Sequence, residues 1–132
     1  MSSKPVEAGS LKVGSFIVID GEPCKIVEIE RSKPGKHGSA KVRITAIGFF
    51  DNAKRSIVAP AGSTVEAPII VKRSAQVIAI LRDTVQLMDL ETYEVYEVPL
   101  PQEDEIKTKL DIGVEVEIWE LLGKRKIVRV RR

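Results

Sequence analysis

The sequence has little of the side-chain chemistry on which most enzymes depend. Its 132 residues include one cysteine, Cys24, and one histidine, His37. A metal centre needs several such ligands at suitable spacing, and a cysteine nucleophile needs a base that a third group orients. No pair of carboxylates with catalytic spacing stands out either. We therefore expect no enzymatic activity, no metal site and no dissociable cofactor.

The single cysteine also excludes an internal disulfide. Disulfides persist in oxidising compartments, so their absence favours a reducing cytoplasm. Cys24 falls in a run that is typical of a β-strand. We expect it to pack as a small hydrophobic residue and not to act as a reactive thiol.

Long apolar runs are missing as well. The longest, such as Val77–Leu81, are far too short to cross a bilayer, and the first residues lack the charged-then-apolar pattern of a secretory signal. We therefore expect no membrane association and a cytoplasmic location.

Long helical periodicity is absent, and short runs of alternating apolar and polar residues take its place. One stretch, 102–109, predicts a short helix, because acidic residues come early in it and lysines come late. Strands are expected over residues 15–20, 24–30, 42–47, 55–59, 76–81, 84–89, 94–98, 114–121 and 126–130. Several short strands with regular turns indicate an all-β fold of small barrels.

A boundary between two domains is expected near residue 71. Turn residues at 62–64 and the pair Ala67-Pro68 precede a fresh alternating pattern, which predicts domains over 1–70 and 71–132. Residues 1–70 carry 10 Lys/Arg against 7 Asp/Glu, and residues 71–132 carry 11 against 12. In the second half the bases gather in 124–132, and this last strand could touch an RNA backbone.

Aromatic residues make up only 5% of the chain. Tyr93, Tyr96 and Trp119 lie among acidic residues, so a platform for stacking nucleic-acid bases is not favoured. Trp119 has apolar neighbours in the sequence, and we expect it in the core. Phe49 and Phe50 are expected to pack at a strand end.

What the sequence does contain is a basic, glycine-punctuated segment, Ser32–Lys41, between two predicted strands. The flanking runs predict a β-hairpin. Gly35 and Gly38 accept the positive φ values of a tight loop, while Pro34 fixes φ just before the turn. Lys36 and His37 are therefore expected at the apex.

Positive charges crowd this end of the hairpin with no Asp or Glu among them: Arg31, Lys33, Lys36, Lys41 and Arg43. Such crowding is tolerated where a loop projects into solvent, and it becomes useful when the partner is a polyanion. A solvated charge run without a partner is the simpler interpretation. A nucleotide-binding P-loop is excluded, because Glu30 stands where its first glycine is required and His37 replaces the metal-binding hydroxyl.

The same residues carry a resemblance to a known family. The pattern Lys-x-Gly-Lys-His-Gly-x-Ala-Lys, found here over residues 33–41, is the hallmark of the archaeal and eukaryotic translation initiation factor 5A family, which is related to bacterial elongation factor P. The chain matches every fixed position, and its length and its Gly48–Asp51 segment also resemble the family. Ser39 stands where the eukaryotic branch commonly has histidine, so the chain looks closer to the archaeal branch.

The resemblance implies a special role for Lys36. In that family this lysine receives a 4-aminobutyl group from spermidine, which gives deoxyhypusine, and is then usually hydroxylated to hypusine. The resemblance also implies an SH3-like barrel over 1–70 and an OB-fold over 71–132. The loop that deoxyhypusine synthase would recognise around Lys36 consists of Lys33, Pro34, Gly35, His37, Gly38, Ser39, Ala40 and Lys41.

The resemblance further implies a translation factor that binds the ribosome beside the P-site tRNA. The modified lysine would reach the peptidyl transferase centre and promote peptide bond formation at stalls during elongation, with roles also in initiation and termination. Contacts with RNA or the ribosome are expected at Arg31, Lys33, Lys41 and Arg43, and the protein is expected to be a monomer. The alternative is a general basic RNA-binding module without modification, in which these charges are interchangeable.

Overall fold

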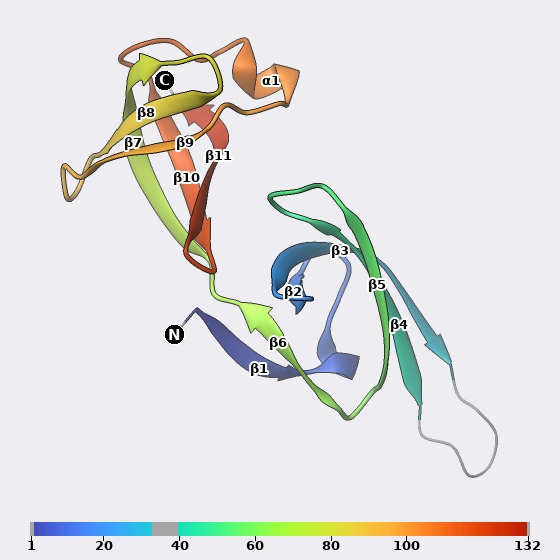
Figure 1. Cartoon of the computed structure of the whole chain (residues 1–132). Coiled ribbons are helices and arrows are strands. Elements are labelled where there is room, and N and C mark those ends of the chain that lie inside the picture. Colours follow the sequence, from blue (N-terminus) through green and yellow to red (C-terminus); the bar gives the residue numbers. More distant parts are fainter. Residues whose placement is uncertain (1, 33–39, 132) are drawn as a thin grey trace. The chain divides into compact units, whose positions relative to one another are not determined.

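A computed structural model describes residues 2–32 and 40–131 of the chain (Figure 1). The chain divides into two compact units, Met1–Ile69 and Ile70–Arg132, and each unit is built almost entirely of strands. No helix among the described residues is long and apolar enough to cross a membrane. The all-β fold class expected from the alternating runs is thus confirmed.

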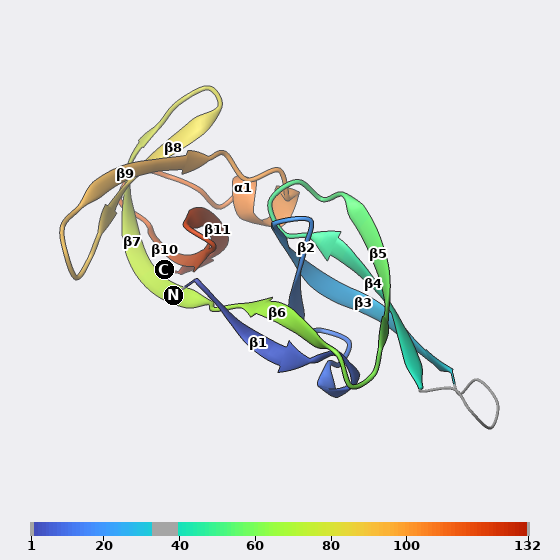
Figure 2. The same cartoon turned by 60° about the horizontal axis from the view of Figure 1, so that its bottom comes forward.

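The described residues of the first unit form six strands and one short 3-10 helix. A four-stranded antiparallel sheet has the order β2-β3-β4-β5, and a separate antiparallel pair joins the first and last strands of the unit, β1 and β6, as Figure 2 shows. The elements are β1 (Ser3–Glu7), η1 (Ala8–Ser10), β2 (Phe16–Ile19), β3 (Glu22–Ser32), β4 (Lys41–Gly48), β5 (Lys54–Pro60) and β6 (Thr64–Pro68).

Alternation along β4 builds the core of the first unit. Val42, Ile44 and Ala46 are buried, while Lys41 before Val42 and Arg43 after it are exposed. This is the period of two that places successive side chains on opposite faces of a sheet. The same core takes in Cys24 of β3, which is fully buried, so its expected role as a packed small residue is confirmed.

The second unit is a five-stranded antiparallel sheet of order β11-β10-β7-β8-β9, with contacts between β11 and β9 that bring its two edges together. Its core includes Val77, Leu87, Val116, Ile118 and Ile127, all at most 1% exposed. The elements are β7 (Val71–Ile80), β8 (Thr84–Asp89), β9 (Val95–Pro99), α1 (Asp104–Lys107), β10 (Glu115–Leu121) and β11 (Lys124–Arg131).

Three details differ from the sequence-based expectations. The helix expected over 102–109 is a single turn, α1. Strands β1 and β6 were not expected at all. Trp119 is only partly buried and not a core residue, because the alternation of β10 turns Val116 and Ile118 inward and Trp119 outward. Phe49 packs edge-on against Phe16 just after β4 ends, as expected of a residue at a strand end.

Candidate functional site

The predicted hairpin is present, formed by β3 and β4 in antiparallel register (Figure 1). Its last paired residues are Ser32 and Lys41, and β5 pairs with the other side of β4, where Lys41 lies opposite Pro60. The N–H of Ala61 donates to the carbonyl of Ala40 at 2.8 Å, which extends this pairing by one residue. A three-stranded stem therefore holds the segment that contains Lys36.

Residues 33–39 lie outside the described part of the chain. The predicted site residues in this range are Lys33, Pro34, Gly35, Lys36, His37, Gly38 and Ser39. The geometry of the site is therefore the geometry of the stem on which these residues are mounted. Ala40 and Lys41, the other two loop residues named from the sequence, are described.

The basic residues of the stem project from two different faces of the sheet. Arg31 lies opposite the buried Val42, whereas Arg43 lies opposite Glu30 and Lys41 lies opposite Ser32. Lys41 and Arg43 thus project from one face of the sheet and Arg31 projects from the other. The structure brings together two of the predicted contact residues, Lys41 and Arg43, and sets Arg31 apart from them.

Arg31 is engaged by the backbone of its own unit. Its Nη1 donates to the carbonyl of Gly9 at 2.9 Å, and its Nη2 donates to the carbonyl of Leu11 at 3.1 Å. Carbonyls at the end of a short 3-10 helix need such donors. The sequence alone gave no sign of this anchoring role, because the partners are 22 and 20 positions away in the chain.

A chain of hydrogen bonds ties the two legs of the hairpin together below the loop. Arg31 on β3 binds the carbonyl of Gly9, the N–H of Gly9 donates to the carbonyl of Ala61 at 2.8 Å, and Ala61 in turn binds Ala40. A Cβ on Gly9 would lie 2.9 Å from the carbonyl oxygen of Ala61. Glycine is therefore required for this close approach. We call Arg31, Gly9, Ala61 and Ala40 the hairpin clamp.

The far end of β4 is fixed by a second cluster within the Gly48–Asp51 segment. Asp51 accepts a bidentate pair of hydrogen bonds from Arg55, at 3.1 and 2.8 Å. The hydrogen bond from Arg55 lowers the pKa of Asp51 to about 2. A Cβ at Gly48 would collide with this carboxylate, which explains a glycine at that position. Burial meanwhile raises the pKa of the nearby Cys24 thiol.

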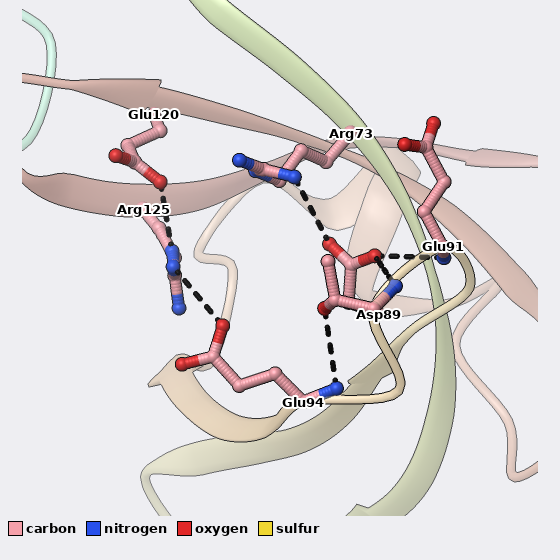
Figure 3. Close-up of polar contacts among 7 residues, drawn as sticks. Arg73, Asp89, Glu91, Glu94, Glu120 and Arg125 are labelled. Atoms are coloured by element: carbon pink, nitrogen blue, oxygen red, sulfur yellow. Dashed lines mark hydrogen bonds and ion pairs between the residues drawn. The ribbon is translucent and has the colours of Figure 1, made fainter.

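The second unit carries a polar cluster near the turn between β8 and β9 (Figure 3). Asp89, 2% exposed, accepts hydrogen bonds from the N–H groups of Glu91 and Thr92 at 2.8 and 2.9 Å. These bonds hold the pKa of Asp89 below its ordinary value, and Arg73 lies 3.7 Å from the same carboxylate. The cluster stabilises the tight turn between β8 and β9, and its charged groups pair with one another.

Elsewhere in the cluster, Arg125 binds Glu120 at 3.0 Å and lies over the ring of Tyr96. Among residues 2–32 and 40–131, no group of three or more His, Cys, Asp and Glu side chains is placed to hold a metal ion. The described residues therefore point to the hairpin as the first candidate for a functional site.

Two family models cover nearly the whole chain. Residues 2–63 match the model described as translation initiation factor 5A-like, N-terminal. Residues 69–131 match the model described as eukaryotic elongation factor 5A hypusine, DNA-binding OB fold. The expected pair of barrels, SH3-like and OB-fold, agrees with these matches.

Individual relatives agree over their full length. The chain is 66% identical to the translation initiation factor 5A of Thermofilum pendens, over 99% of both chains, and 55% identical to that of Korarchaeum cryptofilum, over 99% of this chain and 98% of the other.

Solved structures of similar proteins show the same fold. The factor 5A of Methanococcus jannaschii is 52% identical with a TM-score of 0.92, over 98% of this chain and 96% of that one. A family protein from Naegleria fowleri is 33% identical with a TM-score of 0.78, over the whole of both chains. A nine-residue pattern, two family models and full-length relatives coincide, and the chain belongs to the translation initiation factor 5A family.

Proposed function

We propose that this protein is a ribosome-binding translation factor whose active group is Lys36 in its deoxyhypusine or hypusine form. The observation that carries the proposal is the complete modification motif, residues 33–41, mounted between two paired strands of a chain that belongs to this family. The protein itself performs no bond chemistry in translation. It supplies a cationic arm to a reaction that the ribosome catalyses.

The modification changes what a lysine can reach. In the net reaction, the Nζ of Lys36 forms a bond to the aminobutyl carbon that is attached to the secondary amine of spermidine. The bond between this carbon and the secondary nitrogen breaks, and propane-1,3-diamine leaves. The product has roughly twice the reach of lysine and two amines that are both protonated near neutral pH. Such a thin, doubly charged arm would reach phosphates that the shorter side chain of an unmodified lysine cannot.

The loop that carries this arm starts and ends on a fixed stem. Pairing on both sides of β4 and the hairpin clamp fix the ends of the loop at Ser32 and Lys41. A segment with fixed ends has less conformational entropy to lose when it binds. We propose that the arm steadies the acceptor end of the P-site tRNA at the peptidyl transferase centre and so promotes peptide bond formation at stalls.

We propose further partners for the stem and the loop. Lys41 and Arg43 share one face of the stem and would neutralise ribosomal RNA phosphates beside the loop. Deoxyhypusine synthase would recognise the loop itself, residues 33–41. Arg31 would act differently, by holding the stem in position through Gly9 and Leu11.

A general RNA-binding module without modification is the second candidate. Its supporting observation is the pair of exposed cations, Lys41 and Arg43, on one face of the stem. In that case Lys36 would be one phosphate neutraliser among several, and it would need no added group.

Intact mass measurement of protein purified from its natural host separates the two candidates. If the protein is the translation factor, we expect its mass to increase by one aminobutyl group, with or without one oxygen, and peptide sequencing should map the addition to Lys36. Co-expression of Lys36→Arg with the modifying enzyme should give no mass increase. A native protein with unmodified Lys36 would contradict the proposal.

A further inference from the structure

One face of the second unit has an unusual charge arrangement. Glu117 on β10 points outward, by the alternation that turns Val116 and Ile118 into the core, yet it is only 6% exposed. Three side chains cover it: Trp119 of the same strand, and Arg129 and Arg131 of the neighbouring β11. A carboxylate in an outward position is normally solvated, so the burial of Glu117 shows that neighbouring side chains make specific contacts with it.

The Glu117 carboxylate is saturated with donors. Its Oε2 accepts from the Trp119 Nε1 at 2.6 Å, and its Oε1 lies 2.7 Å from Nη2 of Arg131 and 3.2 Å from Nε of Arg129. The hydrogen bonds from Trp119 and Arg131 hold the pKa of Glu117 below its ordinary value. The carboxylate is therefore ionised at neutral pH and fixes one edge of each guanidinium.

Both arginines still face solvent. Their side chains are 61% exposed for Arg129 and 48% for Arg131. A guanidinium has five N–H donors, and Glu117 engages one nitrogen of each. The two guanidinium groups meet at the same oxygen, Oε1 of Glu117, so their remaining donors are presented side by side.

Lys72 adds a third positive charge on the same face. It lies opposite Trp119 in the register of β7 and β10, and its Nζ is 4.8 Å from the centroid of the indole ring. Lysine over an aromatic face is held by the ring quadrupole. Glu115 lies opposite Arg131 and shares this face of β10. The face therefore presents Lys72, Arg129 and Arg131 against the carboxylates of Glu115 and Glu117, an excess of positive charge.

We propose that this face, formed by β7, β10 and β11, binds the phosphate backbone of RNA, with Glu117 as the positioning residue for Arg129 and Arg131. The choice of RNA as the polyanion rests on the membership of a translation factor family. The site itself is independent of Lys36 and of its modification.

The usual oligonucleotide face of an OB-fold is not suited to this task here. In that fold, strands two and three carry the ligand, and they correspond to β8 and β9. Glu97 is exposed on β9, and Glu94 lies just before the strand begins. These carboxylates repel phosphates, so we place the contact on β7, β10 and β11 instead.

Trp119 determines what the face can recognise. Its ring faces Lys72 and its Nε1 is held by Glu117, so the contacts of the indole position a cation and the buried carboxylate. Base-independent contacts to phosphate position an RNA without identifying its sequence. We therefore expect binding that is steeply dependent on salt and indifferent to base sequence.

The test uses the full chain carrying unmodified Lys36 and fluorescently labelled RNAs of equal length: a duplex and two single strands of different sequence. Arg129→Gln and Arg131→Gln should each weaken binding several-fold at low salt and reduce the slope of log affinity against log salt by about 1. Arg82→Gln, which removes an exposed arginine in the turn between β7 and β8, is the matched control and should leave both quantities unchanged.

Glu117→Gln separates positioning from simple charge. Removing a negative charge should tighten RNA binding if only net charge matters, whereas loss of the anchor for two arginines should weaken it. Circular dichroism and the midpoint of thermal unfolding establish that each variant is folded. Wild-type affinity in Arg129→Gln and Arg131→Gln, or an equal loss in Arg82→Gln, would overturn the site. Tighter binding by a folded Glu117→Gln protein would overturn its positioning role. None of these outcomes bears on the modification of Lys36.

Discussion

At the scale of single residues, two arginines of one basic segment have different roles because they project from opposite faces of a sheet. Arg31 and Arg43 belong to one basic segment of the sequence, and both were expected to contact RNA. In the structure Arg31 donates to the carbonyls of Gly9 and Leu11, while Arg43 projects from the opposite face of the sheet. The sequence shows the charge of an arginine, but its partner depends on contacts between distant segments.

This difference predicts unequal effects on stability. Arg31→Gln should lower the free energy of unfolding by about 1–2 kcal/mol, because it removes two hydrogen bonds that a charged group donates to backbone carbonyls. Arg43→Gln should change it by less than about 0.5 kcal/mol, as is usual for exposed positions. Urea unfolding followed by circular dichroism measures both. Equal stability of the two variants would contradict an anchoring role for Arg31.

Glu117 and Trp119 provide a built-in reporter of pH. The folded-state pKa of Glu117 lies below its ordinary value of 4.5, so its ionisation stabilises the fold above that pH, and this stabilisation is lost as the pH falls through the lower, folded-state value. Trp119 is the only tryptophan and binds this carboxylate. Its fluorescence should therefore change in acid at a midpoint below 4.5.

The control for this titration is Glu117→Gln, which keeps the side-chain size and removes the titrating group. Its tryptophan emission should show no transition in that range. A midpoint at or above 4.5 in the unaltered protein would show that the carboxylate is not held by its three donors.

At the scale of elements, alternation predicted the strands that have one buried face, and it failed where a strand has little burial. β1 contains Pro5, is mostly exposed and shows no period of two, while β6 alternates over only four residues, Thr64 to Ala67, which is too short a run to stand out in the sequence. The stem of the site was predictable because β3 and β4 flank a loop rich in glycine. The hairpin clamp was not, since it joins backbone groups from three separate segments.

The contribution of the hairpin clamp to stability can be tested by alanine substitution of two nearby glycines, Gly9 and Gly62. Gly9→Ala places a Cβ against the carbonyl of Ala61, and forcing such a contact typically costs about 1–3 kcal/mol. Gly62→Ala is the matched control, because a Cβ there meets nothing within 4 Å. Thermal unfolding should show a lower midpoint for Gly9→Ala and an unchanged or slightly higher one for Gly62→Ala.

The same pair of variants tests whether the clamp matters for function. If the clamp orients the loop, Gly9→Ala should be modified at Lys36 more slowly by deoxyhypusine synthase at a temperature where it is fully folded. Equal modification rates for the two variants would limit the clamp to a structural role.

At the scale of the whole molecule, two units with separate cores share one chain. The apolar cluster of the first unit runs from Ala8 to Ala46, and that of the second from Ala75 to Ile127. We expect fragments 1–70 and 71–132 each to retain β-structure, measured by circular dichroism. Loss of structure in both isolated fragments would indicate a single cooperative domain.

Fragment 1–70 should also remain a substrate for deoxyhypusine synthase, because it contains the whole hairpin. Fragment 71–132 should take up no label from spermidine. A failure of a folded fragment 1–70 to be modified would show that the enzyme also needs the second unit.

The central claim is that the modified lysine acts on peptide formation and is not merely one more positive charge. The most direct measurement is the rate of peptide formation on ribosomes stalled at consecutive prolines, recorded alongside ribosome affinity, for modified protein, unmodified protein and Lys36→Arg. We predict folded proteins that all bind ribosomes, with stimulation of the rate by the modified form and a large loss in the other two. Equal stimulation by all three would contradict the account, and so would a loss explained entirely by affinity.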